Sequence, residues 1–284
     1  MIIKNIKKNL LEYIFKIICL LAIILPLLIL FFLIADTFLV AKNKLNLSFL
    51  TSFPSKNFDK AGVLPSLLGT IYLMLLTMII SIPLGICSAI YLEEYSKNNF
   101  FKKIIEINIG NLAGLPSVIF GLLGLEIFVR FFNLGPSLIA AALTLSLLIL
   151  PIIIIACRES LKMVPLNLKE AAIALGASQL RVIWHITLPL SVSQMITGII
   201  LALSRAIGES APLIILGAAA YIAFIPSNIM SEFSSLPLQI FQWVQKPQSG
   251  FLQNASAAII VLLIILFFMN AVATFFRYKS EKKY

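Results

Sequence analysis

Six long apolar runs constrain what this 284-residue chain can fold into more than any other feature of its sequence. Each run holds about 20 residues or more, which is the length that a helix needs to cross the hydrocarbon core of a bilayer. We therefore expect an all-α integral membrane protein with six transmembrane helices in a single domain, residues 1–284. The expected spans are residues 17–35, 64–92, 107–129, 138–157, 191–221 and 255–276.

Composition favours a membrane protein over a soluble domain, because 60% of the residues are hydrophobic and only 12% are charged. The net charge of +10 does not indicate nucleic-acid binding, since the basic residues gather beside apolar runs, where they orient a protein in the membrane. The first run follows several lysines, as in a signal peptide. It is longer than a typical signal-peptide core and lacks a small-residue cleavage site, so we expect it to remain as the first span.

The basic residues also predict the orientation. If both termini lie on one side, 15 of the 22 Lys and Arg residues fall on that side and six on the other. Cytoplasmic loops are enriched in Lys and Arg, so both termini and the loop of residues 158–190 are expected in the cytoplasm. The inner residues are Lys4, Lys7, Lys8, Lys16, Lys97, Lys102, Lys103, Arg158, Lys162, Lys169, Arg181, Arg277, Lys279, Lys282 and Lys283. The outer residues are Lys42, Lys44, Lys56, Lys60, Arg130 and Lys246, and Arg205 lies within a span.

Small residues recur in the third apolar run at alternating steps of four and three. Such a stripe on one face of a helix lets a neighbouring helix approach closely in lipid. We expect a helix-packing face made of Gly110, Gly114, Ser117, Gly121 and Gly124.

The cysteine and histidine residues of this sequence indicate no metal site. Cys19, Cys87 and Cys157 lie in or at the ends of apolar runs without C-x-x-C spacing, so inert buried thiols are expected. His185 is the only histidine and cannot build a metal site alone.

The polar stretch of residues 170–189 separates two apolar runs and has the signals of two short helices. Asn167 is a suitable N-cap, and Glu170 three positions later completes a capping box. Gly176 can take the left-handed conformation that ends a helix, and Ser178 can cap a second helix running to about Thr187. The residues alone leave two interpretations open: an amphipathic connector on the membrane surface, or a helix that docks in a groove of another protein.

Charged side chains inside the fifth run need an explanation. Arg205 and Glu209 are four residues apart and share one helical face. A charge at the centre of a span costs about 2.5–3.5 kcal/mol on insertion scales, so this pair should face protein or water. It is either a structural ion pair or part of a path where the guanidinium meets an anionic solute. Glu126 and Arg130 lie near the outer end of a span, where we expect membrane anchoring.

The polar stretch resembles the EAA loop of ABC importer permeases: Glu-Ala-Ala, three residues, Gly, nine residues, and Ile-x-Leu-Pro. The resemblance implies a cytoplasmic coupling helix that sits in a cleft of the ATPase subunit, with His185 on the same surface. The docking residues that it implies are Glu170, Ala171, Ala172, Gly176, Leu188 and Pro189.

Two further segments resemble the phosphate-specific ABC permeases. They are residues 111–124, with Asn-Leu-Ala-Gly-Leu-Pro-Ser and Phe-Gly-Leu-Leu-Gly, and residues 204–213, Ser-Arg-Ala-Ile-Gly-Glu-Ser-Ala-Pro-Leu. Ser210 replaces the usual Thr and retains a hydroxyl, and the Ala-Pro that follows resembles the A-type subunit. The implied substrate path consists of Arg205, Glu209 and Ser210. The similarity covers residues 64–216 well and is weak at the first span, the long outer loop and the tail.

The resemblance implies a type I ABC importer permease fold and a non-catalytic subunit that imports phosphate by alternating access. The implied partners are a second permease in a heterodimer, two ATP-binding subunits and an extracytoplasmic phosphate-binding protein. The chain has no G-x-x-x-x-G-K loop, so ATP is used by the partner and this chain is expected to bind no cofactor. A permease for molybdate or sulfate, a secondary transporter or channel, and a non-transporting scaffold are the alternatives. The docking loop disfavours a secondary transporter or channel, and the mid-span charges disfavour a non-transporting scaffold.

Overall fold

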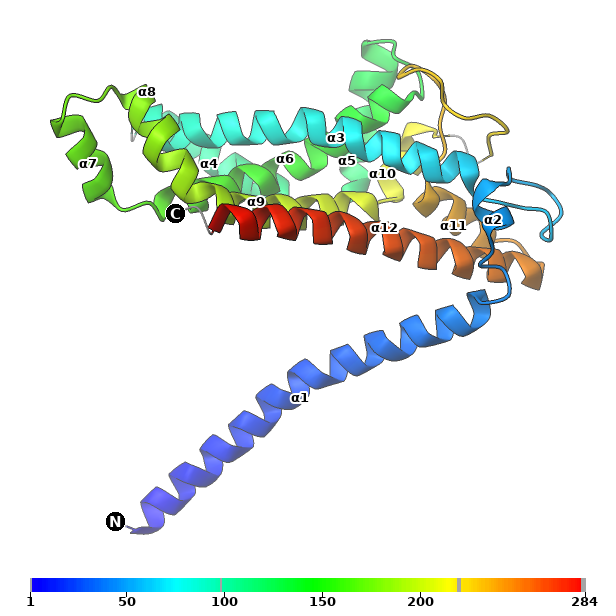
Figure 1. Cartoon of the computed structure of the whole chain (residues 1–284), viewed down its shortest axis with the longest axis horizontal. Helices are drawn as coiled ribbons and strands as arrows, with labels where there is room; N and C mark the ends of the chain where they lie inside the picture. The colour runs from blue at the N-terminus through cyan, green and yellow to red at the C-terminus, as the bar shows by residue number, and fades with distance from the viewer. Residues whose placement is uncertain (1, 98, 219–220, 282–284) are drawn as a thin grey trace.

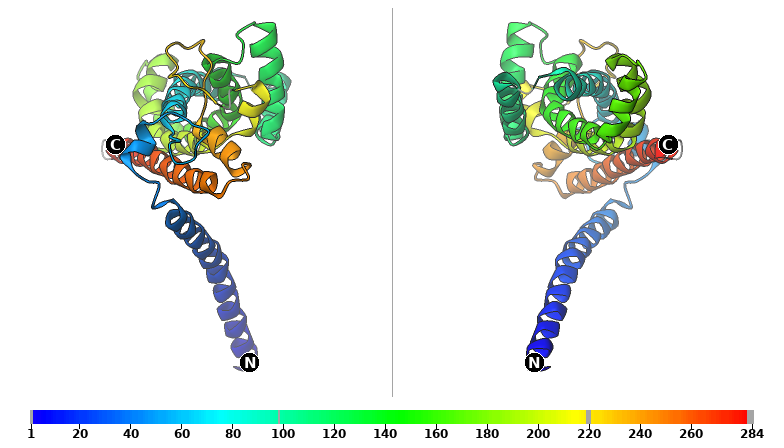
Figure 2. Two further views of the ribbon diagram at one scale, coloured as in Figure 1. Left: turned by 90° about the vertical axis from the view of Figure 1, so that its right-hand side faces the viewer. Right: turned by 90° about the vertical axis from the view of Figure 1, so that its left-hand side faces the viewer.

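The structure, a computed structural model, describes residues 2–97, 99–218 and 221–281. Long helices form a bundle along one direction, and helix α1 (Ile2–Ala41) diverges from it, as Figures 1 and 2 show. Within the described residues, five helices are long and apolar enough to cross a membrane, and a bent pair counts as a sixth span. The expected all-α membrane fold with six spans is therefore confirmed.

Four helices make the bundle: α3 (Leu64–Ile90), α6 (Leu138–Lys162), α9 (Leu188–Ile207) and α12 (Ser249–Glu281). Helix α6 is central, because it packs along both α3 and α9, and α9 packs in turn on α12. Ser137 starts α6 with a side-chain oxygen that accepts from the amide of Ala140. The core between these helices and α5 (Ser117–Gly124) is apolar. Its fully buried members include Leu148, Ile149, Ile153, Leu161 and Phe120.

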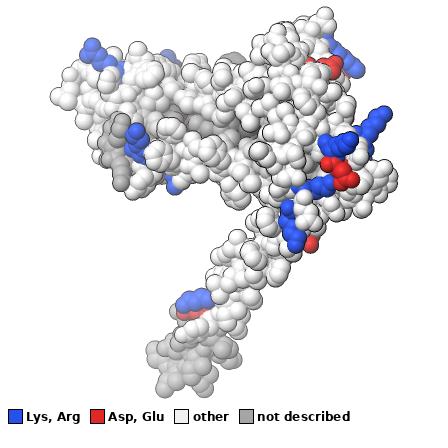
Figure 3. Space-filling view, turned by 45° about the vertical axis from the view of Figure 1, so that its right-hand side comes forward, with Lys and Arg blue, Asp and Glu red and all other residues white. Residues whose placement is uncertain are grey.

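Short helices close the end of the bundle at which α3 and α12 begin. They are α2 (Leu47–Thr51) and α11 (Leu236–Val244), the second of which lies in the stretch expected to be a loop. Phe49 and Trp243, one from each helix, pack with their ring centroids 6.1 Å apart. On the face of the molecule that Figure 3 draws, charged side chains gather toward the ends of the bundle and leave its middle uncharged, which suits a bilayer.

The third span is broken, so the prediction of one helix over residues 107–129 was wrong. Helix α4 (Phe100–Ala113) meets α5 (Ser117–Gly124) at 105°, and the π-helical segment η2 (Leu125–Phe131) continues α5. The physical reason is Pro116, which lacks an amide donor and disfavours helical geometry at the residue before it. The single stripe of small residues is therefore divided between two helices.

The fifth span is also shorter than expected. Helix α9 ends at Ile207, and the short helix α10 (Ala211–Leu216) follows after a break and ends at Gly217, whose φ is +87°. Residues 219–220 of the predicted span lie outside the described residues, as do Lys282 and Lys283 of the basic tail. The prediction of one span over residues 191–221 was wrong, because the polar residues before Pro212 interrupt the helix.

Other helix ends extend beyond the predicted spans, since polar interfacial residues continue a helix outside the hydrocarbon core. The π-helical segment η1 (Tyr91–Tyr95) prolongs α3 in this way. The expectation of three buried thiols was right only for Cys157, because Cys19 and Cys87 point outward from their helices.

Candidate functional site

A helical hairpin protrudes from the bundle at the end where α12 (Ser249–Glu281) finishes (Figure 1). It consists of α7 (Leu166–Ala174) and α8 (Gln179–Val182). The expected N-cap was wrong: Pro165 precedes α7 without a side-chain cap, and Asn167 lies inside the first turn, because proline already fixes a helical start. Gly176 has a φ of +86°, which is the left-handed conformation that the sequence indicated.

The hairpin exposes apolar side chains at a polar end of the molecule. Leu175 is 90% exposed and Ile173 of α7 is more than half exposed, as is Trp184 in the π-helical turn that follows α8. Glu170 and Ala171 are exposed as well, while Ala172 is half-buried. Apolar side chains presented by a short protruding helix are typical of a surface that a partner protein covers. His185 is exposed on the neighbouring turn.

The second helix of the hairpin does not end at Thr187. It continues through the π-helical segment η3 (Ile183–Thr187) into α9, which makes one helix over residues 179–207. Leu188 packs against the bundle core, and Pro189 lies in the first turn of α9. These two docking candidates therefore lie on the bundle side, apart from the four on the hairpin.

Arg205 and Glu209 lie where α9 breaks. The Arg205 Nε atom is 3.5 Å from Glu209 Oε1, with 38% of the Arg205 side chain and 18% of the Glu209 side chain exposed. Arg205 stands in the last turn of α9, because this helix ends earlier than the predicted span of residues 191–221. Among the described residues, no side chain or carbonyl accepts a hydrogen bond from its two terminal nitrogens. The guanidinium fork is therefore open to an anion.

The residues beside this pair fix its position. The Ser204 hydroxyl donates to Asn270 Oδ1 at 2.9 Å, which ties α9 to α12. Ser210 is half-buried directly before α10, and its side chain makes no cap bond to that helix. Asn270 was not predicted, because only the folded chain brings it beside a residue 66 positions away.

The two interrupted helices meet each other. A Cβ atom on Gly121 of α5 would lie 2.8 Å from Pro212 Cα of α10. Helix α5 also packs closely on α6, because a Cβ atom on Gly124 would lie 2.1 Å from Thr144 Oγ1. Gly110, in contrast, has open space around it, and Gly114 stands at the break. Broken helices are tolerated at membrane depth only where protein buries them or where they line a water-filled path. We take the break between α9 and α10 as the candidate transport path, because the partly exposed side chains of Arg205 and Glu209 flank it.

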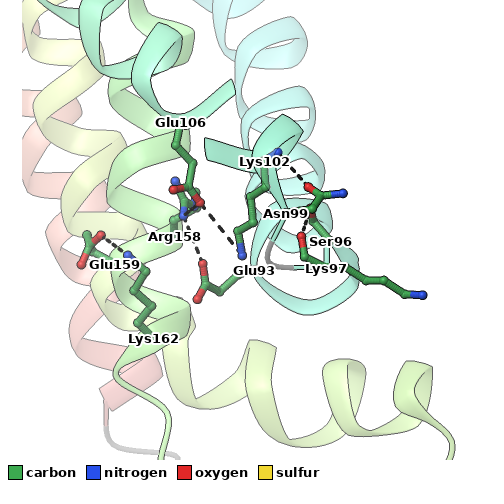
Figure 4. A network of polar contacts seen from close by, with 9 residues as sticks. All are labelled: Glu93, Ser96, Lys97, Asn99, Lys102, Glu106, Arg158, Glu159 and Lys162. Carbon is green, nitrogen blue, oxygen red and sulfur yellow. Dashed lines mark hydrogen bonds and ion pairs between the residues drawn. The ribbon is translucent and has the colours of Figure 1, made fainter. Parts of the chain in front are cut away.

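A second polar site, absent from the sequence predictions, lies at the end of the bundle that carries the hairpin (Figure 4). Arg158 of α6 is buried and pairs with Glu106 of α4 at 2.5 Å and with Glu93 of η1 at 3.4 Å. Lys102 lies 4.0 Å from Glu106. Glu106 is 52 residues and Glu93 is 65 residues away from Arg158 in sequence, so no local pattern could reveal these pairs.

The next residue of η1 holds the hairpin. Glu94 pairs with Lys169 of α7 at 2.6 Å, and the two side chains are only 10% and 15% exposed. The Gln179 side-chain amide, at the start of α8, donates to the backbone carbonyl of Glu94. Both helices of the hairpin are therefore attached to one residue.

An all-α bundle with a protruding hairpin and a broken, charge-bearing span fits the permease subunit of an ABC importer. Residues 81–284 match the family described as "Binding-protein-dependent transport system inner membrane component", and the chain belongs to this family of multi-pass inner membrane permeases. Relatives include the phosphate transport system permease protein PstA of Haemophilus influenzae, 33% identical over 76% of both chains. Another is PstA 1 of Mycobacterium tuberculosis, 31% identical over 78% of this chain and 72% of that protein. The probable ABC transporter permease protein YqgI of Bacillus subtilis is 30% identical over 81% of this chain and 83% of its own length.

Solved structures agree on the fold. A bacterial alginate ABC transporter in complex with an alginate-bound periplasmic protein gives a TM-score of 0.67 at 17% identity, covering 95% of this chain and 94% of that chain. The inward-facing MetNI methionine ABC transporter gives 0.60 at 16% identity, covering 77% and 94%. The chain therefore has the type I ABC importer permease fold.

Proposed function

We propose that this permease subunit moves inorganic phosphate into the cytoplasm. The observation that carries the proposal is Arg205, whose guanidinium fork is open beside the break between α9 and α10. A planar fork matches a tetrahedral oxyanion through two parallel hydrogen bonds. The relatives named as phosphate transport permeases support the same substrate.

In this proposal, Glu209 pairs with Arg205 while the path is empty and Ser210 supplies a hydroxyl. An arriving anion takes over the guanidinium, and its own charge compensates for the desolvation of Arg205. The long Nε–Oε1 distance of 3.5 Å favours such an exchange, because a weak contact costs little to replace.

In the proposed transport complex, partner subunits supply ATP hydrolysis, the other half of the path and the delivery of the substrate. Two ATP-binding subunits bind the exposed hairpin at Glu170, Ala171, Ala172 and Gly176, a second permease completes the path, and an external binding protein delivers phosphate. ATP-driven closure of the ATPases pushes on the hairpin and switches the path from outward-facing to inward-facing. ATP hydrolysis takes place on the separate ATP-binding chains.

Phosphate uptake by three variants at matched expression tests the role of Arg205. Arg205→Lys keeps the charge and loses the fork, so uptake should fall at least ten-fold while membrane insertion persists. Arg205→Ala should abolish uptake, and Arg205→Ala with Glu209→Ala should not restore it. The matched control is Arg130→Lys, at an exposed pair with Glu126 that has the same spacing, and it should transport normally.

Two outcomes would contradict the proposal. Recovery of uptake in the double neutral variant would make the pair purely structural. The second substitution removes the unpaired Glu209 carboxylate that Arg205→Ala leaves behind, but it cannot restore a contact between Arg205 and the anion. Transport of molybdate or sulfate by the wild-type complex, without phosphate transport, would retain the permease and replace its substrate.

A further inference from the structure

We propose that Glu93 and Glu94, consecutive residues of η1, are positioning residues that couple the docking hairpin to the transport helices. Glu94 forms an ion pair with Lys169 of the hairpin, and Glu93 forms one with Arg158 of α6. The inference rests on membership of the ABC permease family and applies whichever solute is transported.

The first step concerns how the hairpin is attached. Helix α7 contributes no buried residue to the bundle, so apolar packing does not hold it there. Its ion pair from Lys169 to Glu94 is well shielded from water, and the amide of Gln179 binds the same turn of η1. A force applied to α7 by a docked partner therefore reaches η1 through Glu94, in addition to the covalent route through α8 into α9.

The second step concerns η1 itself. It continues α3 without interruption, and Leu92 is buried within it. Neighbouring residues on a helix point to different sides, so Glu93 and Glu94 contact different helices. In Figure 4 the Glu93 carboxylate points to Arg158, and Glu106 of α4 approaches the same guanidinium from another side.

The third step leads from α6 to the transport path. Arg158 is buried, with 8% of the residue exposed, and a buried charge cannot exchange its carboxylates for water without cost. Helix α6 therefore has to follow η1. It packs tightly on α9, since a Cβ atom on Gly198 would lie 2.2 Å from Ala156 Cβ. Helix α9 carries Arg205, so the contacts form an unbroken line from the hairpin to the break.

Charge reversal of the Glu94–Lys169 pair tests the coupling in the full complex, purified with its ATPase and permease partners and reconstituted into vesicles. Glu94→Lys and Lys169→Glu should each lower the uptake of labelled orthophosphate per ATP hydrolysed at least ten-fold. The double variant, with the pair reversed, should recover at least half of the wild-type ratio. Glu93→Gln should lower the ratio by a smaller factor, because the amide keeps a weaker hydrogen bond to Arg158.

The matched control is Lys162→Glu, at an exposed ion pair with Glu159 on α6 that shares no ion pair with Arg158, Glu93 or Glu106 (Figure 4). It should leave the ratio unchanged. A merely structural pair would reduce the amount of assembled complex and leave uptake per ATP intact. An unchanged ratio in both single variants, or a double variant no better than the singles, would overturn the proposal.

A second measurement needs no transported solute, so failure of the coupling and failure of the phosphate proposal can be told apart. Ile214 is exposed on α10, just beyond the break in α9. A cysteine placed there, in a background without native cysteines, should change its labelling rate when ATP and vanadate trap the ATPases. The single reversals should abolish this change and the double reversal should restore it. Persistence of the change in the single variants would overturn the coupling even if no orthophosphate were transported.

Discussion

Gly176 makes the sharp turn between α7 and α8, with a φ of +86° and open space around its α-carbon. An L-residue pays about 1–2 kcal/mol to adopt this conformation, and a β-branched one pays more. We predict that Gly176→Val uncouples the ATPase from transport, because the strained turn reorients α7 against its partner. The measurement is solute uptake and ATP hydrolysis in the same vesicles.

Asparagine tolerates the left-handed conformation, so Gly176→Asn is the matched control and should stay coupled. No neighbouring atom lies within 4 Å of the position of an added Cβ, and a steric clash therefore does not contribute. Normal transport by an assembled Gly176→Val complex would show that the turn need not be left-handed.

Individual residues were predictable where the cause is local. Gly176 was identified because its conformation depends only on its own backbone, and Arg205 with Glu209 because their spacing fixes one helical face. Arg158 escaped prediction because its partners come from other helices. The N-cap at Asn167 was wrong because Pro165, two residues earlier, also starts a helix and leaves the asparagine within it.

Helices α5 and α10 meet at an intimate contact that glycine permits. A Cβ atom on Gly121 would lie 2.8 Å from Pro212 Cα, a backbone atom that cannot move aside alone. We predict that Gly121→Ala destabilises the complex by about 1–3 kcal/mol, as overpacking commonly does. The measurement is the temperature at which half of the detergent-purified complex loses its native elution on gel filtration.

Gly110→Ala provides the comparison, since nothing lies within 4 Å of an added Cβ there. Alanine is the better helix former by about 1 kcal/mol, so this variant should be as stable as the wild type or slightly more so. Equal losses in the two variants would mean that the Gly121 contact is looser than the structure indicates.

At the level of elements, hydropathy located the membrane segments but not their breaks. The starts of α3 and α6 at Leu64 and Leu138 agree with prediction, because apolar runs begin abruptly there. The breaks before Ser117 and after Ile207 were missed, since an apolar run looks continuous whether or not a proline bends it. The missed break after Ile207 is the place where the candidate path lies.

The whole molecule is asymmetric in its burial. The apolar window of α1 is 0% buried, whereas that of α6 is 67% buried. Helix α1 therefore contributes little to the stability of the bundle, and its apolar side chains need lipid or a partner chain around them. Charge is asymmetric too, since basic residues dominate the side that carries the hairpin.

That asymmetry leads to a prediction of topology. Ser178, on the hairpin, and Ser249, at the start of α12, are both exposed and lie on opposite sides of the expected membrane. Cysteines placed there, in a background without Cys19, Cys87 and Cys157, should react with a membrane-impermeant maleimide from different sides. The Ser178→Cys variant should label only in inverted vesicles, because the Lys and Arg residues around the hairpin favour the cytoplasmic side. The Ser249→Cys variant, on the other side of the membrane, should label only in intact cells. Detergent-solubilised samples give the full labelling of each site as a control. Labelling of both from one face would contradict the six-span arrangement, since α9 and the break beyond it must carry the chain across between these two positions.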